Sequence, residues 1–390
     1  MQTKKKPNWN VILIAAIIFA AISVAILVSC AVVAKQSEPE PTEPPAPTEP
    51  VSYAIMDVYD TLIEASMTQS YNAAKSVPKA YWISENVDVP PAPNLTCYGQ
   101  TDDPASLQWL LEEAAELLDG QSTVFHTDLE IAPYSNITYY LDKSILVVTW
   151  QQILDNCVYT FSEIKISHPS QFRRYLAKDE FNSDYTFPVI TMAETVNAVM
   201  ASSADHYRGR NQGIVVYKGK VEQSSYGDKI DTCFIDQNGD LILVPAGTMT
   251  SHEEIQQFID ENKIHSSIAF GPILVEDGVR CEPETYYLGE IWDKYARAAL
   301  CQKDSLHYVI VMANSQNSYR NIPTIHMFAE QIEKLGCQKA YTMDGGKTGT
   351  ISMNGMNLNP KTSGSRWVSD ILYFATAIPY TEETPGPITP

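Results

Sequence analysis

Hydrophobic and polar residues occur in short runs over the chain from about residue 139 onward. Segments such as ILVVTW and GIVVYKGKV are short and rich in β-branched residues, which favours strands. Three pairs of such runs enclose turn residues and predict hairpins, around Asn238-Gly239, Lys303-Asp304-Ser305 and Asn354-Gly355. The last apolar run, VSDILYFATAI, predicts a closing strand.

Between these strands lie four segments in which apolar residues recur at helical spacing. They are PSQFRRYLAK, MAETVNAVMASS, SHEEIQQFIDENK and PTIHMFAEQIEKLG, and Gly336 at the end of the last segment is a typical C-cap. Hairpins with intervening helices predict an α+β domain over residues 139–380, with a mixed or antiparallel sheet core and flanking helices.

The amino-terminal pattern is different. Residues 1–10 form a basic stub, and residues 11–34 carry no charge over a length that can cross a bilayer as one helix. Lysines before the span predict that the rest of the chain lies outside the cytoplasm. Alternatively, LVSC is a lipobox, and the chain is a lipoprotein anchored at Cys30.

Three further segments predict no catalytic chemistry. Residues 35–52 alternate Pro with Glu and Thr and predict an extended linker. Residues 53–138 read as an accessory or stalk region, with a packing helix over 104–120. The tail, 381–390, is expected to be disordered.

Composition excludes some partners and sites. The formal net charge is −20, which argues against nucleic acid because phosphate binding needs a basic face. Six cysteines follow Cys30, which permits three disulfides or buried thiols, and no CxxC pair indicates a zinc ribbon.

The stretch YTMDGGKTGT, residues 341–350, is a candidate for chemistry. Gly345 and Gly346 permit positive φ and close approach of a ligand, and exposed N–H groups in such a turn can bind phosphate. Asp344 is then an acid, a base or a metal ligand. An ordinary tight turn with a solvated Asp is the alternative.

Other candidates are scattered. Asp205 and His206 lie in SADHYRGRNQG, which is either a phosphate-facing loop or an ordinary polar one. Glu163 alternates with apolar neighbours, and Arg297 opens a strand. IDQNGDL resembles a calcium loop superficially, but a hairpin turn explains it better. Calcium is therefore possible but not indicated, and no metal site and no cofactor are predicted.

Six blocks in order resemble the phosphodiester glycosidase family, over residues 145–379. They are TFSEIKISHPSQFRRYLA, ETVNAVMASSADHYRGRNQGIVVYKGKV, DTCFIDQNGDL, SIAFGPILVEDG, RAALCQKDSLHYVIVMAN and AEQIEKLGCQKAYTMDGGKTGTISMNG. The last resembles the most specific signature of the family, a helix followed by Leu-Asp-Gly-Gly-Gly-Ser. The family includes the lysosomal uncovering enzyme and bacterial members associated with exopolysaccharide.

The resemblance implies an acid/base set of Asp344 and Asp205, joined by Glu163. It also implies substrate contacts, from Gly345, Gly346, Thr348, Arg297, Lys347, His206, Ser203 and Arg320. The chain departs from the family pattern at Lys347-Thr348, at Ser203-Ala204 and at Asn314-Ser315, which replaces a Gly-Arg pair. A phosphate-binding arginine is therefore expected elsewhere, at Arg297 or Arg320.

The expected function is that of a membrane-tethered extracellular hydrolase. It would cleave a sugar-1-phosphodiester in cell-envelope or exopolysaccharide metabolism, with a phosphorylated glycan as partner. The departures leave a second reading open, in which the domain is a catalytically degenerate glycan- or phosphoglycan-binding module. A third reading is a structural partner in an envelope complex through residues 51–140.

Overall fold

The computed structural model describes residues 89–101, 135–209, 212–225, 229–287, 291–315, 321–360 and 367–377. All of them lie in the second of the two units of the chain, Tyr59–Pro390. The predicted anchor, linker, packing helix and tail, and Arg320, lie outside the described residues. No helix in the described ranges is long and apolar enough to cross a membrane.

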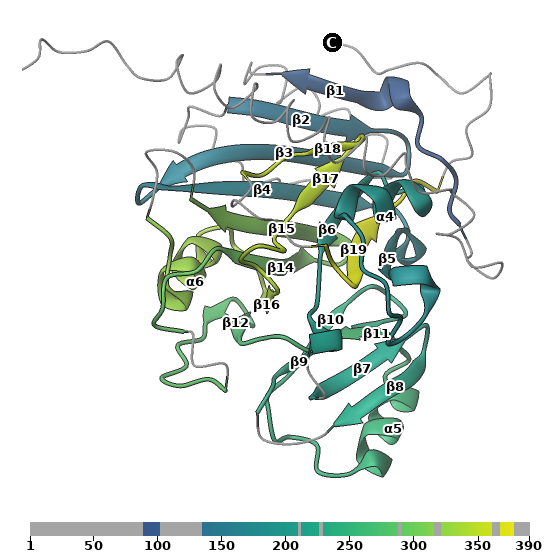
Figure 1. Ribbon diagram of the computed structural model, residues 1–390, viewed down its shortest axis with the longest axis vertical. Helices are drawn as coiled ribbons and strands as arrows, with labels where there is room; N and C mark the ends of the chain where they lie inside the picture. Colours follow the sequence, from purple (N-terminus) through teal and green to yellow (C-terminus); the bar gives the residue numbers. More distant parts are fainter. Residues whose placement is uncertain are drawn as a thin grey trace, which may run out of the picture. The chain divides into compact units, whose positions relative to one another are not determined.

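Within these ranges, the largest sheet has nine strands in the order β1-β2-β3-β4-β15-β14-β16-β12-β13 (Figure 1). Every described pairing in it is antiparallel. The strands are β1 Tyr98–Thr101, β2 Ser135–Leu141, β3 Ile145–Leu154, β4 Cys157–Ile166, β12 Ile273–Glu276, β13 Val279–Arg280, β14 Arg297–Asp304, β15 His307–Asn314 and β16 Lys339–Met343. Because β1 and most of β2 precede residue 139, the sheet takes strands from the region predicted as a stalk.

Three smaller antiparallel sheets complete the described strands. The five-stranded sheet has the order β18-β17-β6-β19-β5, the three-stranded sheet β10-β9-β11, and the last is the β7-β8 hairpin. Their strands are β5 Phe172–Leu176, β6 Met200–Ser203, β7 Gly213–Tyr217, β8 Lys220–Ser225, β9 Thr232–Asp236, β10 Leu241–Val244, β11 Ile264–Ile268, β17 Ile351–Met353, β18 Met356–Asn357 and β19 Asp370–Phe374. The three predicted hairpins are present as β9–β10, β14–β15 and β17–β18, and β19 confirms the closing strand.

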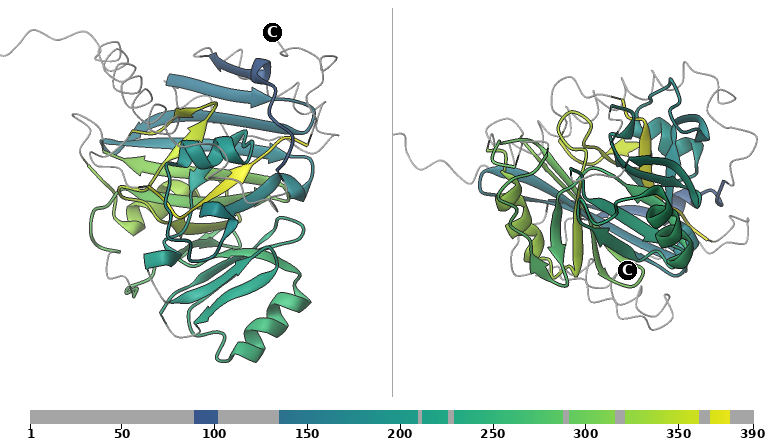
Figure 2. Two further views of the ribbon diagram at one scale, coloured as in Figure 1. Left: turned by 45° about the vertical axis from the view of Figure 1, so that its right-hand side comes forward. Right: turned by 90° about the horizontal axis from the view of Figure 1, so that it is seen from below.

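Helices cover the sheets. Helix α6, Ile325–Glu333, packs on the face of the large sheet that includes Val309 and Cys301. The opposite face shares a core with the five-stranded and three-stranded sheets. Helix α4, Val189–Thr195, covers the other face of the five-stranded sheet. Helix α5, His252–Glu261, shares a core with β7 and β9. In Figure 2 it lies beside the β7–β8 hairpin. The described part is therefore mostly sheet with few helices, consistent with an α+β class.

The helix predictions have mixed outcomes. Helices α5 and α6 are confirmed, and the hydroxyls of Ser251 and Thr324 cap them. The helix predicted across PSQFRRYLAK is wrong, because the segment forms two 3-10 turns, Pro169–Gln171 and Ala177–Asp179, on either side of β5. Pairing of β5 with β19 explains the difference, since a distant strand overrides the local pattern.

The six described cysteines are free thiols in this structure and form no disulfides among themselves. Cys97, Cys157, Cys233, Cys301 and Cys337 are buried free thiols, and Cys281 is a half-buried one. Buried free cysteines pack as small hydrophobic residues, so the described fold is held by its cores and ladders.

Candidate active site

The candidate site lies where one strand of the large sheet and one strand of the five-stranded sheet end. Strand β16 ends at Met343, and the chain turns at Asp344; strand β6 ends at Ser203, and Asp205 and His206 follow. The Asp344 N–H donates to the Ala204 carbonyl over 2.9 Å, which joins the two segments. The sequence folds this way because each apolar strand is followed at once by polar turn residues.

The two glycines after Asp344 serve different purposes. A Cβ on Gly345 would lie 2.4 Å from the Ala296 carbonyl oxygen, so only glycine lets the turn pack on the start of β14. Gly346 has φ of +58° and open space around it, and its N–H donates to the Ala296 carbonyl over 2.8 Å. The turn is therefore fixed to β14 as well as to β6.

Asp344 and His206 form a partly accessible pair of a carboxylate and an imidazole. His206 Nδ1 lies 3.5 Å from Asp344 Oδ2, and the two side chains are 40% and 13% exposed. A carboxylate that contacts one ring nitrogen leaves the other nitrogen to accept or donate a proton. Such contacts are often long without substrate, so this geometry suits proton transfer to a ligand above the turn.

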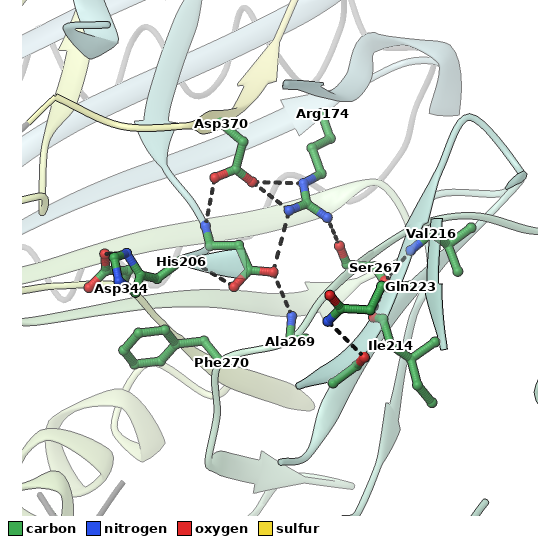
Figure 3. Close-up of polar contacts among 12 residues, drawn as sticks. Arg174, His206, Ile214, Val216, Gln223, Ser267, Ala269, Phe270, Asp344 and Asp370 are labelled. Atoms are coloured by element: carbon green, nitrogen blue, oxygen red, sulfur yellow. Dashed lines mark hydrogen bonds and ion pairs between the residues drawn. The ribbon is translucent and has the colours of Figure 1, made fainter. Parts of the chain in front are cut away.

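Asp205 belongs to a fully buried cluster with Arg174 and Asp370, and Figure 3 labels the last two. Its Oδ2 accepts from Arg174 Nη2 over 3.3 Å and from the Ala269 N–H over 2.9 Å, and its Oδ1 accepts from the His206 N–H over 2.6 Å. Asp370 contacts Arg174 over 2.6 Å and accepts from the Asp205 N–H. The cluster thus positions His206 through its backbone.

One guanidinium shared by two buried carboxylates has an electrostatic consequence. Burial lowers the pKa of Arg174, but Asp370 and Asp205 raise it by more, so its net shift is upward. Burial, together with the charge of Asp205, raises the pKa of Asp370 from 3.8 to about 7 against the opposing effect of Arg174. The cluster therefore holds one cation for two acids, and Asp370 is the acid whose pKa lies near neutral pH.

The Phe-Gly-Pro segment runs beside the same strand end. The Phe270 N–H donates to Tyr341 Oη over 2.8 Å, and the Phe270 carbonyl accepts from Tyr286 Oη over 2.9 Å. The Gly271 N–H donates to the Thr342 carbonyl. In the view of Figure 3 the half-buried Phe270 ring lies on the side of His206 and Asp344 rather than of Arg174. It offers an apolar surface next to the pair.

Comparison with known proteins decides the family. A family model described as phosphodiester glycosidase matches residues 193–375. That range contains Asp205, His206, the Phe270 segment and the Asp344 turn. Residues 193–375 of this chain belong to the phosphodiester glycosidase family.

Solved structures are similar at low identity. The zebrafish N-acetylglucosamine-1-phosphodiester alpha-N-acetylglucosaminidase catalytic domain, auto-inhibited by its pro-peptide, is 16% identical with a TM-score of 0.48, covering 60% of this chain and 83% of its own. A hypothetical protein from Synechocystis is 12% identical with a TM-score of 0.44, covering 61% of this chain and 63% of its own. A comparison with curated proteins gives no match.

The phosphate-binding donors predicted in this phosphodiester glycosidase domain are engaged inside the turn. The Gly346 N–H donates to Ala296, and both the N–H and the hydroxyl of Thr348 donate to the Gly345 carbonyl. Ser203 is also occupied, because its hydroxyl accepts from the Thr350 N–H over 3.2 Å. The N–H groups of Gly346 and Thr348 and the Thr348 hydroxyl thus donate within the turn and do not point at a ligand in this conformation.

The predicted cations differ in position. Arg297 donates to the Pro323 carbonyl over 3.4 Å and to the Asp293 carbonyl over 2.6 Å, so it holds two loops together. Lys347 is exposed at the tip of the turn. Arg320 lies outside the described residues. Of the predicted charges, Lys347 and His206 are the ones that the structure places at the surface of the site.

Glu163 does not lie with the pair. Glu163 is in register with Val309 on β15, and through it with Cys301 on β14 and Ala340 on β16. Ala340 precedes Asp344 by four residues, and β16 lies three strands away from β4. This corresponds to about 13 Å along the strands and about 14 Å across them. Its carboxylate is 1% exposed and contacts Lys303 and His307 over 2.9 and 2.7 Å. The geometry therefore removes Glu163 from the proposed acid/base set.

Sequence reasoning missed Arg174, Asp370 and Asn359. Asn359 accepts from the Ile351 N–H over 2.6 Å and donates to the Gly349 carbonyl over 3.0 Å and to Asn314 Oδ1 over 3.1 Å, which fixes the end of the turn. Reading FRRYL as an alternating strand would have separated Arg173 from Arg174 and marked one of them as inward-facing. No local signal identifies Asn359.

Proposed function

We propose that this chain hydrolyses the glycosidic bond of a sugar-1-phosphodiester and releases the sugar and a phosphomonoester. The observation that supports it is the Asp344–His206 pair at a glycine turn, within a domain of the phosphodiester glycosidase family. Asp344 and His206 divide the acid and base roles, one protonating the departing phosphate oxygen and the other activating water. Asp205 positions His206, and Lys347 supplies positive charge.

The proposal includes a place for the reaction. Residues 11–34 tether the enzyme to the membrane, or Cys30 does so through a lipid, and the domain acts outside the cell. Its substrate is a phosphorylated glycan of the cell envelope or an exopolysaccharide. The uncharged apolar run that follows Lys4, Lys5 and Lys6 supports this topology. The reaction needs no cofactor.

The test is turnover of a panel of sugar-1-phosphodiesters by the full chain in detergent. In water enriched in ¹⁸O, cleavage at the sugar carbon puts the label in the free sugar, whereas attack at phosphorus puts it in the phosphate. We expect labelled sugar. Label in phosphate alone would show a phosphodiesterase instead, and a panel without turnover would refute the hydrolase assignment for those substrates.

A binding module is the second candidate, and one observation favours it. Arg297, Gly346 and Thr348 all use polar groups in internal hydrogen bonds, so the turn offers a phosphate fewer donors than the family resemblance implied. Saturable binding of a phosphoglycan without release of sugar would support this reading. Catalytic release of sugar would exclude it.

A further inference from the structure

A cavity of about 500 Å³ lies beside β5, and its lining includes Arg174 of the buried cluster described above. Its walls come from β5 and the loop before it, from β19, and from the ends of β7, β9 and β11. Among its described lining residues there is none from the Asp344 turn or from 203–206. The volume falls in the range of about 300–1,000 Å³ that small-molecule sites occupy.

The cavity has walls that are held in place. β5 is the last strand of its sheet within the described ranges, so the sheet ends at the cavity. Opposite β5, the Gly219 N–H donates to the His265 carbonyl over 2.8 Å, which ties the β7–β8 turn to β11. The Gln237 N–H donates to the Lys263 carbonyl over 3.0 Å, which ties the β9 turn to the same segment.

Aromatic side chains form part of the lining. Phe172, Tyr175, Tyr217 and Tyr373 all line the cavity while being at most 5% exposed. Phe172 stacks on Phe374 with 4.7 Å between ring centroids. Buried rings lose little freedom when a ligand packs on them, and aromatic rings combine an apolar face with a polar handle in tyrosine. Such walls suit the mixed surface of a sugar.

The charges at the cavity favour an anion. Arg173, Lys218 and His265 line it. Asp179 already contacts Lys218 over 2.6 Å and accepts from Tyr217 Oη. Asp236 accepts from the N–H groups of its own turn. Among the described residues, no group of three or more His, Cys, Asp and Glu side chains could hold a metal ion.

The charges around His265 are also positive. Burial and the positive charges of Arg173 and Lys218 lower the pKa of His265. This occurs in a chain of net charge −20. Arg173 and Lys218 therefore act together on the His265 side of the cavity, where an anion can meet both cations.

We propose that this cavity is a second binding site, separate from the candidate active site, for an anionic saccharide: a sugar that carries a phosphate or a carboxylate. The rings contact the sugar, and Lys218 and Arg173 face the charge. Bound there, an envelope glycan would be held by the domain independently of hydrolysis. The proposal does not depend on catalysis at Asp344.

The test is calorimetric titration of the full chain in detergent with glucose 6-phosphate, glucuronate, glucose and inorganic phosphate. We expect glucose 6-phosphate and glucuronate to bind. The affinities of glucose and of inorganic phosphate should each be about tenfold weaker or more, because glucose lacks the anionic group and phosphate lacks the sugar. Lys218→Gln should weaken binding of the two anionic sugars about tenfold. Lys220→Gln is the matched control, since Lys220 is 73% exposed on the same hairpin and contacts Glu222.

Four outcomes would overturn the proposal: no binding of either anionic sugar, glucose binding as tightly as glucuronate, phosphate binding as tightly as glucose 6-phosphate, or equal effects of Lys218→Gln and Lys220→Gln. Asp344→Asn separates the two sites. Binding that survives Asp344→Asn and falls with Lys218→Gln belongs to the cavity, whereas binding that falls with Asp344→Asn and not with Lys218→Gln belongs to the candidate active site.

Discussion

Two acidic regions lie next to each other near the ends of β6 and β16, and they differ in their exposure to solvent. In the Arg174 cluster, Asp205 and Asp370 are fully buried and their oxygens accept from guanidinium and backbone donors. In the Asp344–His206 pair, the imidazole is 40% exposed and the carboxylate 13%. The same residue type thus fills two roles. A carboxylate whose acceptor sites are occupied supports structure, and one that remains accessible is available for proton transfer.

The largest expected effect is on catalysis by the partly exposed Asp344–His206 pair. His206→Gln should lower kcat on a sugar-1-phosphodiester by about 10²–10⁴-fold, the usual contribution of a positioned acid or base. The unfolding free energy should change little, because the ring is partly exposed. Arg208→Gln is the control, since Arg208 lies two residues away and pairs with an Asp184 that is 98% exposed. Equal losses in both variants would remove His206 from the mechanism.

Arg174→Ala probes the buried side. Removing the cation leaves two uncompensated carboxylates in the interior, which should destabilise the protein by about 3–5 kcal/mol. Denaturant unfolding measures the effect, and activity per folded molecule should fall less than in His206→Gln. A change below about 1 kcal/mol would show that the cluster does not hold the fold.

The Asp344 turn can be tested through its glycines. Gly345→Ala places a Cβ 2.4 Å from the Ala296 carbonyl oxygen and should cost about 1–3 kcal/mol with loss of activity. Gly346→Asn is the matched change, because the site has open space and Asn tolerates positive φ. It should retain stability to within about 1 kcal/mol. The reverse order of the two effects would contradict the described turn.

The last expected effect is a pH dependence from Asp370. Its pKa in the fold, about 7, lies above its ordinary value of 3.8. The folded protein therefore binds this proton more tightly than the unfolded chain, and the contribution of Asp370 to stability declines as pH rises from about 4 to about 7. Asp370→Asn should flatten that part of the stability profile. An unchanged profile would show that Asp370 does not titrate in this window.

Local chemistry explains which features the sequence could predict. Asn238-Gly239 and Asp344-Gly345-Gly346 specify turns within a few residues, and the β9–β10 hairpin and the Asp344 turn followed from them. The Arg174 cluster could not be found this way. Arg174 meets Asp205 across 31 residues and Asp370 across 196, and β5 forms only when β19 pairs with it. Burial decides the role of Asp205, and burial depends on those distant partners.

The most direct test of the division between the two regions is Asp344→Asn beside Asp205→Asn, each measured for unfolding free energy and for kcat per folded molecule. We predict that Asp344→Asn remains as stable as the wild type and releases no sugar. Asp205→Asn should lose stability and retain most of its activity per folded molecule. An active Asp344→Asn beside an inactive, stable Asp205→Asn would contradict the account and move the chemistry to the buried cluster.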